Sequence, residues 1–140
     1  MKSGSRGLAV SVEAAILLPV LVLFIGLLAT SARVALTQQA LNAVAAQAAR
    51  ATSLERSAAE GRRHAEEAVE VGLREQGVEC LTSRISIDAA ALEAPLGSSG
   101  EVKISIDCVI GVADVTLPTF PGSFPLTGHA TSSVDRYRHR

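Results

Sequence analysis

The residues of this chain that could carry chemistry are one acidic side chain, two cysteines and three histidines. The acidic side chain is Glu13, which lies at the start of a long apolar run. A carboxylate in an apolar helix costs free energy unless it pairs with a cation or reaches the membrane surface. The sequence therefore predicts either a positively charged partner for Glu13 or a side chain that extends to the lipid headgroups.

The two cysteines, Cys80 and Cys108, both follow the apolar run and are 28 residues apart. This spacing is neither that of a C-x-x-C redox motif nor that of a zinc site. In an oxidising compartment the two residues would form a disulfide, and otherwise they would remain two buried thiols. We expect the disulfide, and the pair of thiols is the alternative.

The histidines, His64, His129 and His139, have no spacing to the cysteines that would make a metal site. The chain also lacks a glycine-rich phosphate loop, an H-E-x-x-H motif and a G-x-S-x-G motif. Its formal net charge of -1 provides no basic field for nucleic acid. We therefore expect a protein that is not an enzyme, holds no cofactor or metal and does not bind nucleic acid.

The element that must position Glu13 is the apolar stretch 8–32. Residues 14–32 carry no charge, and a helix of this length covers about 28 Å, close to the hydrocarbon core of a bilayer. Lipid offers no partner for open backbone groups, so we expect residues 8–32 to form one transmembrane helix. Pro19 lies within it and should kink the helix near Ala15.

Two basic residues, Lys2 and Arg6, precede the apolar run, and no acidic residue does. The positive-inside rule then places the N-terminus in the cytoplasm and residues 33–140 outside the cell membrane. We interpret residues 1–7 as a short basic leader. The alternative is a secretory signal peptide cleaved near residues 29–31, which would release a soluble protein.

Residues 33–77 are expected to form a helical region outside the membrane, in which the first helix continues to about Thr52. Its apolar residues recur at spacings of three, four and seven, and form one alanine-rich stripe. The members of this stripe are Val34, Leu41, Val44, Ala48 and Ala51. It would pack on the chain's own domain or on a neighbouring subunit. A second helix should begin at Ser57, which has capping-box spacing to Glu60, and should end at Gly77.

Residues 78–140 are expected to form a small β-domain. Apolar residues alternate with polar ones in two runs, 81–87 and 102–110, which predicts an antiparallel hairpin. We pair Ile85 with Ile104. The fold class is therefore α+β: a long N-terminal transmembrane helix, a second helix and a small antiparallel sheet of about three strands.

The expected register places Leu81 opposite Cys108, so Cys80 falls one residue out of step. A β-bulge at the start of the first strand would bring the two sulfur atoms together. The connection between the strands, residues 89–100, is long for a hairpin and is expected to be mobile. A third strand, from Leu126, should lie at an edge of the sheet.

Three short stretches near the N-terminus form a pattern: Arg6-Gly7, then Val12-Glu13-Ala14-Ala15, then Leu17-Leu18-Pro19-Val20. With these stretches the first thirty residues resemble the TadE/TadG-like family of pseudopilins from tight-adherence (Flp) pilus systems, and the resemblance implies that the α+β fold is pilin-like. An alanine-rich helix followed by a small β-domain with two cysteines also fits that family in its layout.

The resemblance implies processing by a prepilin-type peptidase after Gly7, which leaves Leu8 as the mature N-terminus. It also implies that Glu13 meets the α-amine of a neighbouring subunit. Glu13 is the sixth residue after Gly7, whereas the family's usual position is the fifth, and cleavage after Leu8 would restore that position at the loss of the glycine.

The function that this resemblance implies is that of a minor pilin-like subunit in the assembly of a Flp-type pilus or a related secretion apparatus. Its partners would be other pilin-like subunits, the pilus assembly machinery, the peptidase and membrane lipid. The alternatives are a single-pass membrane-anchored module that binds an envelope ligand, and a secreted soluble protein.

Overall fold

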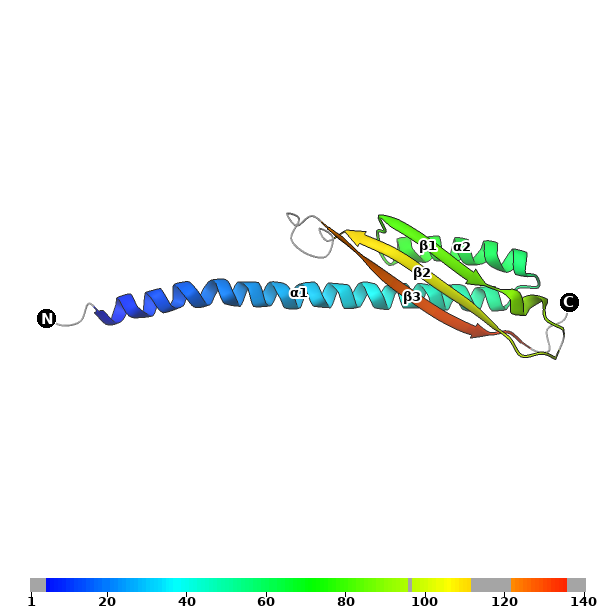
Figure 1. Ribbon diagram of the computed structural model, residues 1–140, viewed down its shortest axis with the longest axis horizontal. Helices are drawn as coiled ribbons and strands as arrows, with labels where there is room; N and C mark the ends of the chain where they lie inside the picture. The colour runs from blue at the N-terminus through cyan, green and yellow to red at the C-terminus, as the bar shows by residue number, and fades with distance from the viewer. Residues whose placement is uncertain (1–4, 96, 112–121, 136–140) are drawn as a thin grey trace.

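The computed structural model describes residues 5–95, 97–111 and 122–135, and the side chains from residue 14 onward. In chain order the elements are α1 (Ser5–Ser53), α2 (Ala58–Glu75), β1 (Thr82–Asp88), the short 3-10 helix η1 (Ala90–Glu93), β2 (Glu101–Gly111) and β3 (Ser123–Ser133) (Figure 1). The strands form one antiparallel sheet in the order β1-β2-β3. This architecture confirms the predicted α+β fold.

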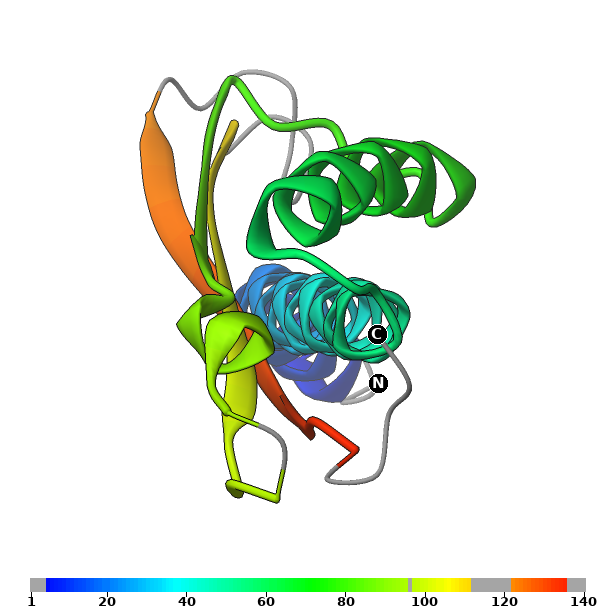
Figure 2. The same ribbon diagram turned by 90° about the vertical axis from the view of Figure 1, so that its right-hand side faces the viewer.

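The helix α1 has two halves with different surroundings. Its N-terminal half extends alone, whereas its C-terminal half lies against the sheet and α2 (Figure 1). Leu41, Val44 and Ala48 are at most 1% exposed, so the alanine-rich stripe packs on the chain's own domain. Figure 2 shows that α1 and α2 lie on the same side of the sheet.

The helix α2 begins and ends at the residues predicted from the sequence. Ser57 is the N-cap, and its Oγ accepts a hydrogen bond from the Glu60 N–H at 3.2 Å. At the other end Gly77 has a φ of +64°, a conformation that glycine adopts without strain. The Val78 N–H then donates to the Leu73 carbonyl at 3.0 Å, which completes a Schellman motif. Both predicted ends are confirmed.

The strand register differs by two residues from the prediction. Ile85 pairs with Ile106 instead of Ile104. A shift of two leaves the same side chains on the buried face, so alternation alone does not distinguish the two registers. At the start of this ladder the Leu81 N–H donates to the Val109 carbonyl at 2.8 Å while Thr82 is also paired with Val109. Two successive residues thus oppose one, as in a β-bulge.

Leu81 was expected on the apolar face and is instead 66% exposed, because it precedes β1 at this bulge. The connection after β1 contains a short helix that was not predicted. This helix is η1, in which Leu92 is 2% exposed and belongs to the core. The burial of Leu92 between the sheet and α2 packs η1 against the domain, and the mobility expected for residues 89–100 stays a prediction.

The third strand starts at Ser123, three residues before the predicted Leu126. Pro125 lies inside it, opposite Val109. Proline has no N–H to give to a ladder and is therefore confined to edge strands. The sheet order places β3 at an edge, so the predicted edge position is confirmed.

Two glycines allow the elements to approach closely. A Cβ on Gly128 of β3 would lie 2.6 Å from the backbone carbon of Leu41 in α1, and a Cβ on Gly72 of α2 would lie 2.9 Å from Val44. Real Cβ atoms are not found at such distances. The core consists mostly of alanine, valine, leucine and isoleucine, and these close approaches let its small side chains fill the interior.

Candidate functional site

The free half of α1 exposes large apolar side chains on all sides. From Ile16 to Leu28 each of them is between 53% and 74% exposed, namely Ile16, Leu17, Leu18, Val20, Leu21, Val22, Leu23, Phe24, Ile25, Leu27 and Leu28. Soluble monomers rarely expose a continuous apolar surface of this size. Within the described part of the chain, one helix is long and apolar enough to cross a membrane, and it is α1.

The polar side chains near the end of this apolar surface are satisfied within the helix. The Thr30 and Ser31 hydroxyls donate to the Gly26 and Leu27 carbonyls, each at 2.9 Å. A hydroxyl that bonds to the carbonyl four residues back can lie in lipid without an unpaired donor. Residues 14–32 therefore match the hydrocarbon core in length, charge and hydrogen bonding.

The residues that the resemblance implies in processing and assembly all lie within α1. The helix begins at Ser5, so Gly7, Leu8 and Glu13 are helical. Glu13 is about 9 Å along the axis from Gly7 and about 7.5 Å from Leu8. The roles of these three residues remain predictions, and the first four residues of the expected leader lie outside the described part.

Pro19 lies inside α1, and the helix continues on both sides of it. A proline removes one backbone hydrogen bond from a helix, and in a membrane neighbouring groups can compensate for that loss. The kink expected near Ala15 remains a prediction.

Two side chains that the sequence analysis did not single out join α1 to β3. The Gln38 Nε2 donates to the Thr127 carbonyl at 2.6 Å, and the Asn42 Oδ1 accepts from the His129 N–H at 3.2 Å. These two hydrogen bonds attach α1 to the backbone of the edge strand β3. The sequence signal that could have indicated these contacts was the i, i+4 spacing of two amide side chains within an otherwise alanine-rich stripe.

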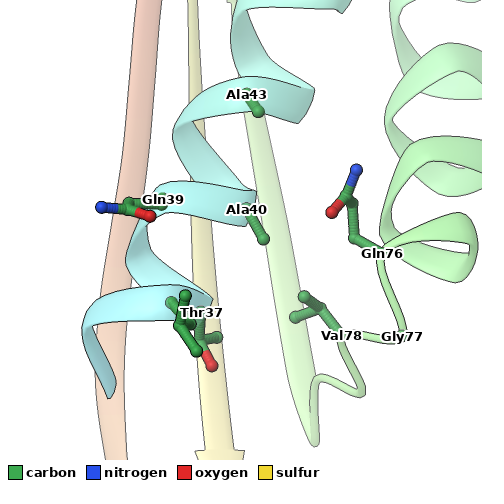
Figure 3. A pocket seen from close by; sticks show the side chains of 8 residues that line it. Thr37, Gln39, Ala40, Ala43, Gln76, Gly77 and Val78 are labelled. Carbon is green, nitrogen blue, oxygen red and sulfur yellow. The ribbon is translucent and has the colours of Figure 1, made fainter. Parts of the chain in front are cut away.

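An open groove of about 410 Å³ lies between α1 and the end of α2 (Figure 3). Its lining residues are Leu36, Thr37, Gln39, Ala40, Ala43, Gln76, Gly77 and Val78. None of these lining residues has a side chain that titrates near neutral pH. The groove therefore offers shape and apolar contact, and its lining supplies no general acid or base.

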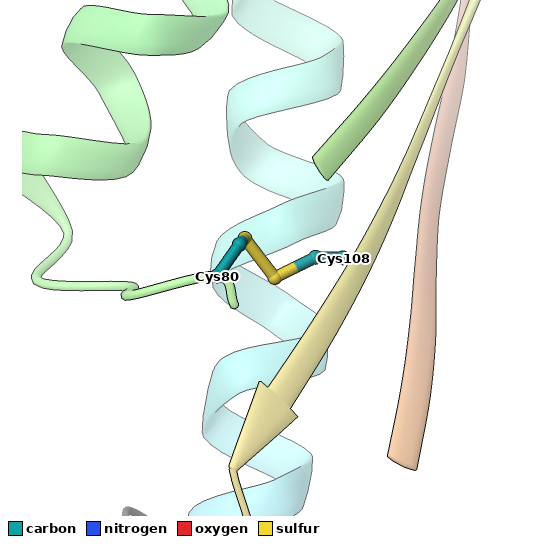
Figure 4. Close-up of a disulfide and its surroundings, with 2 residues drawn as sticks. All are labelled: Cys80 and Cys108. Atoms are coloured by element: carbon teal, nitrogen blue, oxygen red, sulfur yellow. A yellow bond between two sulfur atoms is a disulfide. The ribbon is translucent and has the colours of Figure 1, made fainter. Parts of the chain in front are cut away.

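The cysteines form a disulfide between Cys80, just before β1, and Cys108 in the central strand β2 (Figure 4). Their Cα atoms are 5.4 Å apart. The pairing of Leu81 with Cys108, for which a bulge was predicted, is not the one observed: Cys108 pairs with Ser83, and Cys80 reaches it from the segment before β1. Cys108 is fully buried, so the disulfide fixes the segment that leaves α2 to the middle of the sheet.

We expect the Cys80→Ala/Cys108→Ala variant to lose about 3 kcal/mol of unfolding free energy, because the bridge closes a loop of 28 residues. The measurement is thermal or denaturant unfolding of the full chain in detergent, with the Leu54→Ala variant, at an exposed site, as control. Two free thiols in native membranes, detected by thiol labelling of the unmodified protein, would contradict the pairing.

Metal and ion-pair chemistry is sparse in the described part of the chain. His64 Nδ1 lies 3.0 Å from Glu55 Oε1, and Arg74 pairs with Glu70 at 2.8 Å on the exposed face of α2. Among the residues that the structure describes, no group of three or more histidine, cysteine, aspartate or glutamate side chains could hold a metal ion. The distinctive features of the molecule are thus its apolar helix and the domain packed on it.

Comparison with known protein families finds a match within the apolar helix α1. Residues 9–50 match the family described as TadE-like protein, which confirms the resemblance found from the sequence. The matched stretch lies entirely within α1 and covers both its free half and most of its packed half. No curated protein and no solved structure matches the chain.

Proposed function

We propose that this TadE-like chain is a minor pilin-like subunit that takes part in the assembly of a tight-adherence (Flp-type) pilus or a related secretion apparatus. The family match relates the chain to Tad pilus proteins. The observation that carries the finer proposal is the division of α1, because one continuous helix has a free apolar half and a half that holds a small domain. Such a subunit can be stored in a membrane and can pack laterally through its helix.

In the proposed mechanism, the prepilin-type peptidase removes residues 1–7 and leaves Leu8 with a free α-amine. The amine is a cation next to an apolar helix, and Glu13 of an adjacent subunit is the anion that it would pair with. Charge pairing lowers the cost of both groups in lipid and sets how two subunits are staggered. The partners are other pilin-like subunits and the assembly machinery.

The proposed topology places the N-terminus in the cytoplasm and the domain outside the cell membrane. Lys2 and Arg6 support this orientation by the positive-inside rule. The disulfide supports it independently, since disulfides persist in the oxidising compartments outside the cytoplasm.

The test is to isolate the native protein from membranes, determine its N-terminus by mass spectrometry and assay which pilus proteins co-purify. We expect a mature chain that begins at Leu8, or at Ala9 if the cut follows Leu8, together with other pilin-like subunits. A chain that begins near Ala32 and is free in the medium would contradict the proposal. A membrane-bound chain that brings down no pilus component would favour the envelope-binding alternative.

A further inference from the structure

The end of the domain that lies nearest the free half of α1 exposes two large apolar side chains. Leu36 on α1 is 64% exposed, and Leu81, just before β1, is 66% exposed. Pro125 of β3 is also exposed. Figure 1 shows that the start of β1, the end of β2 and the start of β3 all lie on this side of the domain.

The contacts between α1 and β3 show how far along the axis of α1 this end of the domain lies. Gln38 bonds to Thr127 and Asn42 bonds to His129. The four-residue step on the helix advances about 6 Å, and the two-residue step on the strand advances about 6.6 Å. The strand and the helix therefore advance in the same direction here, although β3 crosses α1 obliquely (Figure 1), so a step on β3 gives the largest advance along α1 that it can correspond to.

Pro125 lies two residues before Thr127, which is about 6.6 Å toward the free half of α1. Because Gln38 lies about 9 Å beyond Ala32, Pro125 is at a level only a few ångströms beyond Ala32. Leu81 lies across β2 from Pro125, because the Leu81 N–H bonds to Val109 and Val109 pairs with Pro125. Since the strands slant across α1, β1 begins somewhat farther from the free half than β3 does (Figure 1). Leu36 lies about 6 Å beyond Ala32.

Ala32 is the last residue of the uncharged segment 14–32. The headgroup region on each side of a bilayer is about 5–8 Å thick. Leu36 and Pro125 are therefore at headgroup depth when residues 14–32 fill the hydrocarbon core, and Leu81 lies next to them at the outer side of this layer. α1 continues from this core into the domain without a break, so there is no linker that would hold the domain away from the surface.

We infer that this end of the domain is a lipid-contact surface: Leu36, Leu81 and Pro125 rest in the headgroup layer of the outer leaflet. The inference depends on the proposed function in one respect, that α1 crosses the membrane. Its partner is the bilayer surface, because exposed leucines gain free energy when they leave water for the interface. The two-point contact, through α1 and through the sheet, would hold the domain at a fixed tilt.

Single tryptophans test the depth of each point, since the natural chain contains no tryptophan. Four variants of the full chain replace an exposed leucine: Leu21→Trp in the apolar half, Leu36→Trp and Leu81→Trp at the inferred surface, and Leu54→Trp at the far end of the domain. Leu54 is 81% exposed and lies beyond the end of α1, on the order of 30 Å from Ala32. Each is reconstituted in phosphatidylcholine vesicles with and without bromine near the top of the acyl chains.

We expect the brominated lipid to reduce the emission of Leu36→Trp and Leu81→Trp about twofold and to leave Leu54→Trp unchanged, given a contact at headgroup depth. Leu81→Trp decides the inference, because it reports on the sheet and not on α1. Its emission would remain that of Leu54→Trp if the domain stands away from the bilayer. Quenching of all four would also overturn the inference, because the whole domain would then lie flat on lipid.

The Leu21→Trp variant separates the inference from the proposed function. Bromine placed deep in the acyl chains should quench it strongly. If it does not, α1 is not inserted and the proposed anchor fails with the inference. If Leu21→Trp is quenched but Leu81→Trp is not, the anchor stands and the lipid-contact surface alone is wrong.

Discussion

The Glu13→Ala chain is expected to insert into the membrane and fold normally, but to enter the pilus at one tenth of the normal level or less. A tenfold loss requires only about 1.4 kcal/mol of interaction between subunits. An ion pair that is partly withdrawn from water readily provides this, because removal of one partner leaves the other charge unpaired in an apolar environment. The measurement is the amount of the chain in sheared pili relative to the amount in the membrane.

Two matched variants separate the role of this carboxylate from a general effect of charge. Glu13→Gln preserves the size of the side chain and removes its charge, and it should impair assembly as Glu13→Ala does. Glu93→Ala removes an exposed carboxylate of η1 and should leave assembly unchanged. Normal incorporation of Glu13→Ala would mean that this side chain merely extends to the headgroups.

Gly128→Ala is the second substitution with a large expected effect, and we expect it to lower the unfolding free energy by about 3 kcal/mol or more. A Cβ at this position would lie 2.6 Å from the Leu41 backbone carbon and 2.7 Å from the Leu41 carbonyl oxygen. Neither atom belongs to a side chain that could rotate away. The strand would have to move from the helix, and that movement would break the Gln38 and Asn42 bonds to Thr127 and His129.

The test is thermal unfolding of the full chain in detergent, and Gly26→Ala is the matched control. Gly26 has nothing within 4 Å of its added Cβ, and alanine is favoured over glycine inside a helix. That control should unfold no more easily than the natural chain. An unchanged midpoint for Gly128→Ala would show that α1 and β3 do not approach each other as closely as described.

The sequence was sufficient to predict features that depend on nearby residues. The Ser57 cap, the end of α2 at Gly77 and the alternation of β2 each follow from the conformational preferences of a few neighbouring positions. The family resemblance came from a similarly short stretch around Glu13 and Pro19. These features needed no knowledge of which distant segments meet.

Features that depend on contacts between distant segments were not predictable in the same way. The register of β1 on β2 differs by two residues from the predicted one, and alternation is the same in both registers. The position of η1 depends on the burial of Leu92 beside Gly61 of α2. The hydrogen bonds that the side-chain amides of Gln38 and Asn42 make with β3 depend on the position of a strand that follows some 90 residues later in the chain.

The unbroken course of α1 from its apolar half into the domain has a mechanical consequence. A continuous helix transmits rotation about its axis, so the membrane segment and the sheet that packs on the other half of α1 turn together. The rotation of the apolar half of α1 about its own axis, as it packs among neighbouring subunits, then determines which side of the sheet faces outward. Adding a single residue near Ala35 would turn the domain by about 100° relative to the bilayer segment, and it would aim a different surface at the cell's surroundings.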